Sequence, residues 1–179
     1  MSKIAVLCND GVEEIECLTV VDFCRRAGIE VITVSVTGKR QIMGAHQIVF
    51  HADEVYADMN FDEFDGIVYP GGPGTGAMGE KPGVKELAQK FLNNGKMLAA
   101  ICAAPGMISE TGILKEKHAT GYPGCKPKGG AIWSEDAAVV DGNLVTGKGP
   151  GAAAEFAIEI IRYLTGDIKA EQIRTSTMM

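Results

Sequence analysis

Short apolar segments alternate with segments of helical periodicity along most of this chain, and this alternation constrains the fold more than any other feature. The apolar runs are KIAVLC, EVITVSV, GIVYP and KMLAAI, and the helical patterns cover residues 13–27, 82–94 and 103–112. Strands that alternate with helices form βαβ units, whose parallel sheet is covered by helices on both faces. The sequence therefore predicts a three-layer α/β/α sandwich with a mostly parallel sheet.

Three further segments complete this prediction. Residues 36–51, VTGKRQIMGAHQIVFH, contain β-branched residues and glycine turns, and we expect a short hairpin beside the sheet. AAVVDGNLVTG has an Asp-Gly turn between two apolar runs, which is a strong hairpin signal. Residues 150–164 have apolar side chains at helical spacing with Gly166 just beyond, so we expect this helix to close the fold and the tail RTSTMM to fray. No linker or repeat divides residues 1–179, which predicts one domain.

Composition and charge exclude several classes of function. The chain has 179 residues and a formal charge of −6 without a cluster of Lys and Arg, which argues against a nucleic-acid partner. No apolar stretch approaches the roughly 20 residues that a membrane helix needs. The first residues are too weakly apolar for a secretion signal, so we expect a cytoplasmic protein.

The cysteines and histidines give no metal motif. Five cysteines without a CxxC pair predict reduced thiols, with Cys17 and Cys24 in the core and Cys125 exposed. The histidines, His46, His51 and His118, lack the spacing of metal ligands and are expected at the surface or in strands. We therefore expect neither a metal nor a cofactor.

Cys102 occupies the most unusual position in the sequence. In LAAICAAPG, a buried strand ends at Ile101 and a helix begins near Ala103, with Pro105 in its first turn. This places the thiol on a tight strand-to-helix turn that resembles a nucleophile elbow, facing the unpaired N–H groups of the helix. Those groups favour the reactive thiolate. The alternative is a small buried hydrophobic residue that ends a strand.

A glycine-rich turn follows another predicted strand. DGIVYPGGPGTG runs from an apolar strand into Gly71, Gly72 and Gly74, at the sheet edge where open α/β folds bind ligands. Backbone N–H groups there are able to hold an oxyanion. The turn lacks the Lys-Ser or Lys-Thr of a phosphate-binding loop, and an ordinary Gly-Pro turn is the alternative.

Glu16 is a carboxyl group in an apolar stripe. Helical steps from Glu16 lead to Val20, Phe23 and Cys24, so its side chain extends the core-facing surface of the helix. An inward carboxyl is costly unless it is paired or protonated. Beside a thiol, only its protonated form would favour the thiolate. The alternative is a carboxyl that reaches solvent at the helix end, whereas Glu13 and Glu14 are explained by the favourable first turn.

Four motifs together carry a family resemblance. GVEEIE, VYPGGPG, AAICAAPG and TGKGPG occur in an order and at a spacing that resemble the ThiJ/PfpI superfamily, in the branch of the Parkinsonism-associated deglycase and its bacterial relatives. The resemblance covers nearly the whole chain. It implies a flavodoxin-like sandwich of the class I glutamine amidotransferase type, and a homodimer.

The resemblance also implies roles for individual residues. Cys102 corresponds to the oxidisable elbow nucleophile and Glu16 to the protonated partner beside its sulfur. The N–H groups of Gly72 and Ala103 correspond to the oxyanion pocket, and Gly71 is a third candidate for oxyanion or substrate binding. There are departures from the family pattern. Tyr122 stands where several relatives have histidine, Ala103 where the protease branch has histidine, and Lys148 where the deglycase branch commonly has arginine.

Two classes of function follow from one sulfur. As an enzyme, Cys102 would add to a small 2-oxoaldehyde such as methylglyoxal and release lactate, or act on early glycation adducts, with Glu16 and Tyr122 as further catalytic candidates. As a redox sensor or redox-regulated chaperone, the same thiol would be oxidised and read by a partner. Proteolysis and amidotransfer lack a suitably placed histidine. If Cys102 is such a nucleophile, we expect its pKa to lie well below about 8.5, the value for a free cysteine.

Overall fold

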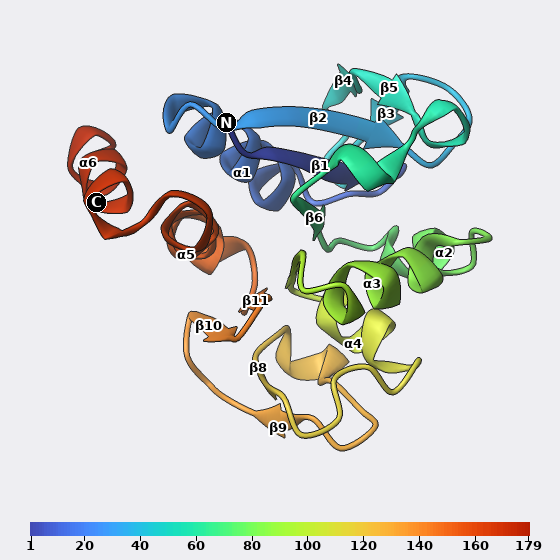
Figure 1. Cartoon of the computed structure of the whole chain (residues 1–179). Helices are drawn as coiled ribbons and strands as arrows, with labels where there is room; N and C mark the ends of the chain where they lie inside the picture. Colours follow the sequence, from blue (N-terminus) through green and yellow to red (C-terminus); the bar gives the residue numbers. More distant parts are fainter.

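The computed structural model describes residues 1–179 and is built around a seven-stranded sheet. Its spatial order is β10-β11-β7-β6-β1-β2-β5, and all neighbours are parallel except the antiparallel pair β10 and β11. The predicted, mostly parallel sheet is therefore confirmed (Figure 1). The strands are β1 (Lys3–Cys8), β2 (Glu30–Ser35), β5 (Glu54–Val55), β6 (Gly66–Tyr69), β7 (Met97–Ile101), β10 (Ala138–Asp141) and β11 (Leu144–Gly147).

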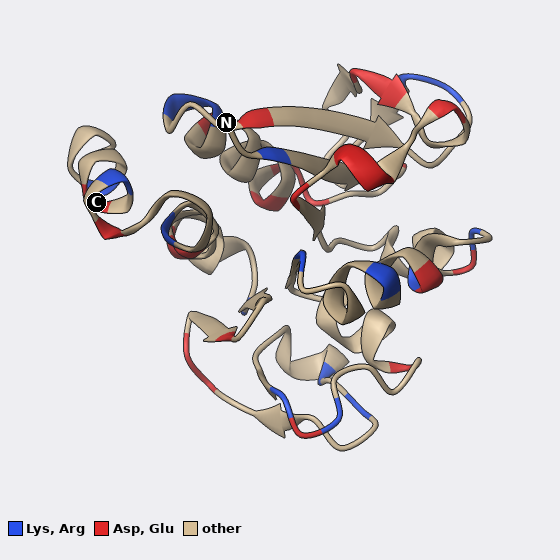
Figure 2. Cartoon of the chain, viewed as in Figure 1, with Lys and Arg blue, Asp and Glu red and all other residues tan.

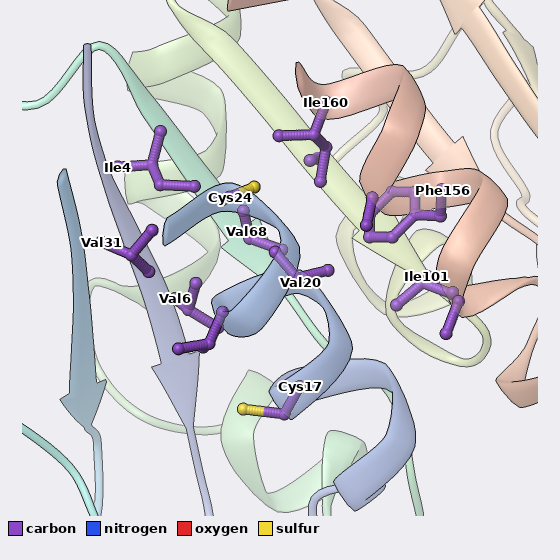
Figure 3. Close-up of a cluster of buried hydrophobic side chains, with 14 of the residues drawn as sticks. Ile4, Val6, Cys17, Val20, Cys24, Val31, Val68, Ile101, Phe156 and Ile160 are labelled. Atoms are coloured by element: carbon purple, nitrogen blue, oxygen red, sulfur yellow. The ribbon is translucent and has the colours of Figure 1, made fainter. Parts of the chain in front are cut away.

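Helices cover both faces of this sheet and make two separate cores. One face packs against α1 (Glu14–Arg26), α5 (Ala153–Thr165) and α6 (Asp167–Ser176), and the other against α2 (Thr75–Gly79), α3 (Val84–Asn93) and α4 (Ala104–Ser109). Alternate residues of β1 enter opposite cores because side chains alternate across a strand. Figure 3 shows the first core, in which Cys17 and Cys24 are buried as predicted.

Both predicted hairpins are present. β3 (Gln41–Met43) pairs antiparallel with β4 (Val49–His51), and β10 turns into β11 at Gly142, whose φ of 62° suits the Asp-Gly turn. A short parallel pair, β8 (His118–Ala119) with β9 (Ile132–Trp133), was not predicted. Single turns of 3₁₀ helix lie at Tyr56–Asp58, Phe61–Glu63, Pro123–Cys125 and Pro150–Ala152.

The carboxyl-terminal end differs from the prediction. The segment 150–164 begins with a 3₁₀ turn, and α5 is not the last element, because the chain turns at Gly166 and continues as α6 to Ser176. Of the residues expected to fray, 174–176 are helical and 177–179 lie beyond the helix. Ala170 and Ile173 bury one side of α6 in the first core. The helix predicted over 103–112 is also shorter and ends at Ser109. None of the helices has the length and apolar character needed to span a bilayer.

Candidate active site

The candidate site lies where four neighbouring strands end. β11, β7, β6 and β1 are adjacent in the sheet and parallel, so their carboxyl ends meet at one edge. Cys102 directly follows β7, and the Gly71–Gly72 pair comes shortly after the end of β6. The N–H of Cys102 donates to the carbonyl of Gly147 in β11 (2.9 Å). The sheet topology therefore brings both predicted turns to one place.

Cys102 forms the predicted strained bend. β7 ends at Ile101, α4 begins at Ala104, and Cys102 between them has φ of 64°, a left-handed conformation that non-glycine residues rarely adopt. The backbone is held there by two hydrogen bonds, one to Gly147 and one from the Tyr122 N–H to the Cys102 carbonyl (2.7 Å). Strain of this kind persists only where surrounding contacts fix it. Only 9% of the residue is exposed.

Two backbone N–H groups face the Cys102 sulfur. They belong to Gly72 and Ala103, the residues predicted to form an oxyanion pocket. Gly72 has φ of 108°, and a Cβ there would lie 2.4 Å from the Glu13 nitrogen, so the turn requires glycine. The same N–H groups that meet the sulfur are placed to meet an oxygen bonded to it or to its substrate.

Gly71 serves a different purpose from Gly72. Its N–H donates to Oε2 of Glu16 (2.8 Å), so this donor is already in use and holds the carboxyl rather than an incoming ligand. A Cβ at Gly71 would lie 2.6 Å from Cβ of Cys102 and 2.7 Å from Oε2 of Glu16. The absence of a side chain at Gly71 is what lets these two residues approach each other.

Glu16 is fully buried and lies against the thiol. Its Oε1 has no hydrogen-bond partner, and its Oε2 and Cβ of Cys102 lie together beside Gly71. Burial raises the pKa of Glu16 to about 7, although hydrogen bonds from Cys102 and Gly71 oppose the rise. The inward carboxyl predicted from helical periodicity is confirmed. Its contact with Cys102, which sequence implied only through the family resemblance, is present.

The predicted low pKa of Cys102 is wrong for a thiol beside an ionised Glu16. Burial, then the negative charge and hydrogen bond of Glu16, raise the pKa of Cys102 to about 12, and the N–H groups of Ala103 and Gly72 lower it only in part. The two groups therefore titrate as a pair. Above about pH 7 the pair holds one proton, and Cys102 is a thiolate only while Glu16 carries that proton.

Glu14 and His46 form an ion pair that sequence reasoning missed. Glu13 caps the helix by accepting from the Ile15 N–H (3.4 Å), but Glu14 is buried and accepts from the His46 N–H (2.7 Å) and faces its Nδ1 (2.9 Å). Burial opposes ionisation of Glu14, yet the hydrogen bonds from His46 lower its pKa. The first-turn explanation is therefore incomplete for Glu14. Gly44 lies against its carboxylate, where a Cβ would overlap it, but only the folded structure shows this contact.

Glu13, Glu14 and His46 are a group of metal-ligating side chains that lie close together. Ligand atoms of Glu13, Glu14 and His46 lie within 4.8 Å of one another. The ion pair accounts for this arrangement, because His46 and Glu14 satisfy each other. His51 and His118 are exposed residues of β4 and β8, as predicted.

Comparison with known proteins assigns the family. The model of the DJ-1/PfpI family matches residues 2–163. This chain belongs to the DJ-1/PfpI family. It is 38% identical to protein dj-1beta of Drosophila melanogaster over 97% of this chain and 95% of the relative. The crystal structure of that protein superposes with a TM-score of 0.94 at 35% identity, covering 100% of this chain and 99% of the other.

Two further relatives have names that describe an activity. A glutathione-independent glyoxalase of Caenorhabditis elegans is 32% identical over 96% of this chain and 93% of its own length. A deglycase of Pyrococcus abyssi is 31% identical over 90% of this chain and 99% of its own length. The DJ-1/PfpI match and the mostly parallel sheet confirm the predicted flavodoxin-like fold.

The residues that depart from the family pattern lie beside the thiol. In this DJ-1/PfpI chain, Tyr122 contacts Cys102 through its backbone, while its side chain is 50% exposed and lines a shallow hollow together with Glu135 and Lys148. Lys148 is tied to Glu135, with its Nζ 3.1 Å from Oε2 and 3.0 Å from the carbonyl oxygen. The structure thus places Tyr122 next to the site without giving its hydroxyl a task.

Proposed function

We propose that this chain is a cofactor-independent glyoxalase or deglycase that acts on small 2-oxoaldehydes, or on early glycation adducts, through a thiohemiacetal on Cys102. One observation carries the proposal: a thiol on a strained bend meets two backbone N–H donors and a carboxyl with a pKa of about 7. The names of the nematode and archaeal relatives support the same chemistry.

The proposed reaction uses all of these groups, and Glu16 acts in two of its steps. The Cys102 sulfur adds to the aldehyde carbon of methylglyoxal, and the carbonyl oxygen takes the electron pair and is held by the Gly72 and Ala103 N–H groups. Glu16 delivers its proton to that oxygen. As a carboxylate, Glu16 then takes the proton of the former aldehyde carbon and returns it to the neighbouring carbon, while the hydroxyl proton of the thiohemiacetal passes to the neighbouring ketone oxygen, which gives a lactate thioester. Water hydrolyses the thioester to lactate and frees the thiol.

Lactate release tests this proposal. Cys102→Ser is expected to lower the rate by at least about 100-fold, because it removes the nucleophile. Cys125→Ser is the matched control, since Cys125 is an exposed cysteine, and it should retain the wild-type rate. The wild-type rate should rise as the pH passes about 7, where the pair of Glu16 and Cys102 loses its first proton. Equal lactate release from wild type and Cys102→Ser would rule the enzyme out.

A redox sensor is the second candidate, and the two N–H donors favour it too. They would hold the oxygens of a sulfinate on Cys102 as well as they hold an oxyanion. Peroxide titration followed by mass mapping should then add two oxygens to Cys102 before Cys125. Selective oxidation together with an absence of lactate would favour the sensor over the enzyme.

We also propose that the chain forms a homodimer. Apolar side chains are exposed on α1 and on the neighbouring β3–β4 hairpin, which the Ala45 N–H joins to the Val12 carbonyl (2.8 Å). Several exposed apolar side chains on adjacent elements are typical of a contact between proteins. The residues are Ile15, Leu18, Met43, Ile48 and Val49.

A further inference from the structure

A hollow of about 530 Å³ opens directly beside the candidate site. Gly72 and Ala103, whose N–H groups face the Cys102 sulfur, form part of its wall. The rest is lined by α2, the start of α3, α4 and the loop that contains Cys125. This volume is in the range of small-molecule sites, and it exceeds what a three-carbon aldehyde requires. The proposed reaction leaves most of the hollow unused.

The rim of this hollow carries an excess of positive charge. Lys85 and Glu110 neutralise each other through an ion pair of 2.6 Å, and Glu80 is the remaining acid. Lys126 and Lys128 face the hollow without a salt bridge. Lys126 is placed by its contact with the Trp133 ring, 4.8 Å from the ring centroid to Nζ. The Lys128 backbone is fixed by its N–H, which donates to Oγ of the buried Ser109 (2.8 Å).

These lysines belong to a basic segment of an otherwise acidic chain. Residues 115–128 contain four lysines and one glutamate, whereas the whole chain has a formal charge of −6. Figure 2 shows basic segments on the loops around β8 and β9. The acids at the start of α1, which are Glu13, Glu14 and Glu16, do not line the hollow. An anionic molecule is repelled from the α1 side and attracted to the hollow.

From this arrangement we propose that the hollow is a subsite for the anionic group of the substrate, held by Lys126 and Lys128 while the carbonyl carbon reaches Cys102. The preferred substrates are then anionic 2-oxoaldehydes and carboxylate-bearing glycation adducts rather than neutral methylglyoxal. This inference rests on the proposed function for the carbonyl chemistry. The anion subsite itself is defined by the two lysines and is measurable without turnover.

Alkylation by a charged and a neutral reagent tests the subsite. Iodoacetate and iodoacetamide attack the same sulfur but differ by one negative charge, and the ratio of their rates at Cys102 reports the local potential. In a Cys125→Ser background, Lys126→Gln with Lys128→Gln should lower the iodoacetate-to-iodoacetamide ratio by about threefold or more at low ionic strength. The iodoacetamide rate reports any change in the thiolate fraction of Cys102, which affects both reagents equally and cancels in the ratio.

The matched control removes two charges elsewhere. Lys115→Gln with Lys169→Gln changes the net charge equally, and neither residue lines the hollow. This variant should retain the wild-type ratio. An equal fall in both double variants would show a general effect of net charge and would overturn the proposal, as would an unchanged ratio in the Lys126 and Lys128 variant.

Trp133 gives a second readout that needs no reactive thiol. It is the single tryptophan of the chain, and Lys126 lies over its ring, so an anion bound there should change its fluorescence. Malonate should give a saturable change in wild type and in Cys102→Ser, and Lys128→Gln, which leaves Lys126 in place, should weaken binding by about threefold or more. Inorganic phosphate as a second probe distinguishes a phosphate from a carboxylate ligand. No saturable change with either anion overturns the subsite, whereas an unreactive Cys102 with intact anion binding overturns only the proposed function.

Discussion

At the scale of single residues, the site depends on one proton shared by Glu16 and Cys102. Burial raises the pKa of both groups. The charge and hydrogen bond of Glu16 raise the pKa of Cys102 further, whereas the hydrogen bond with Cys102 lowers the pKa of Glu16. Placing the proton on Glu16 leaves a thiolate supported by two N–H groups, and placing it on Cys102 leaves a buried carboxylate supported by Gly71. The reactivity of the thiol therefore depends on its carboxyl neighbour.

Glu16→Gln is expected to separate the two groups. Without the carboxylate charge, the pKa of Cys102 should fall from about 12, so the alkylation rate against pH should shift toward lower pH. Iodoacetamide alkylation of wild type and variant measures this shift. Glu30→Gln removes a carboxyl at the amino-terminal end of β2, which is the end of the sheet away from Cys102, and should leave the curve unchanged. An unshifted curve for Glu16→Gln would contradict the coupling.

The same variant should change the pH dependence of stability. The pKa of Glu16 is raised from 4.5 to about 7 by folding, so its contribution to the free energy of unfolding is complete below about pH 4.5 and is lost as the pH rises through about 7. The total loss is about 3 kcal/mol. Urea unfolding at pH 5 and pH 8 should show this decrease in wild type and not in Glu16→Gln.

At the scale of elements, the turn after β6 fixes the distance between α1 and the Cys102 bend. Gly71→Ala would place a methyl group against Cys102 and Glu16, and overpacking of this kind costs about 1–3 kcal/mol. We expect lower stability and slower alkylation of Cys102. Gly76→Ala in α2 is the control, because nothing lies within 4 Å of its new Cβ. That variant should keep wild-type reactivity, and a loss in Gly76→Ala alone would contradict the packing argument.

The helix α6 offers a test of the corrected carboxyl-terminal end. Ile173 is 6% exposed in the first core, and Ile173→Ala should lower the free energy of unfolding by about 2–5 kcal/mol. Ile168→Ala makes the same substitution on the same helix at a residue that is 80% exposed, and it should change stability by about 0.5 kcal/mol or less. Chemical denaturation measures both, and equal values would mean that α6 is not docked.

At the scale of the whole molecule, the apolar surface of α1 and the β3–β4 hairpin predicts the assembly. Ile48 is 53% exposed, and Ile48→Asp should convert the proposed homodimer to monomer by placing a charge in its contact. Light scattering after gel filtration measures the mass. Ile168→Asp on α6 is the control and should leave the mass unchanged. A wild-type chain that is monomeric at micromolar concentration would remove the proposal.

The sequence alone determined the local geometry of this protein. The alternation of apolar and helical segments predicts the parallel sheet, the Asp-Gly pair predicts a hairpin, and LAAICAAPG predicts a cysteine at a strand-to-helix bend. These features depend on neighbouring residues, whose periodicity and turn chemistry are visible in the chain itself. The helical stripe through Glu16 likewise shows its inward side chain.

Tertiary structure decided the properties that arise between distant segments. The pKa of Cys102 depends on burial and on Glu16, 86 positions away in the sequence, and the pairing of Glu14 with His46 depends on how the hairpin meets α1. The docking of α6 depends on its contact with α5 and on the burial of Ala170 and Ile173 in the first core. Charge and desolvation act through space, so the same cysteine motif specifies where the sulfur lies but not where its proton lies.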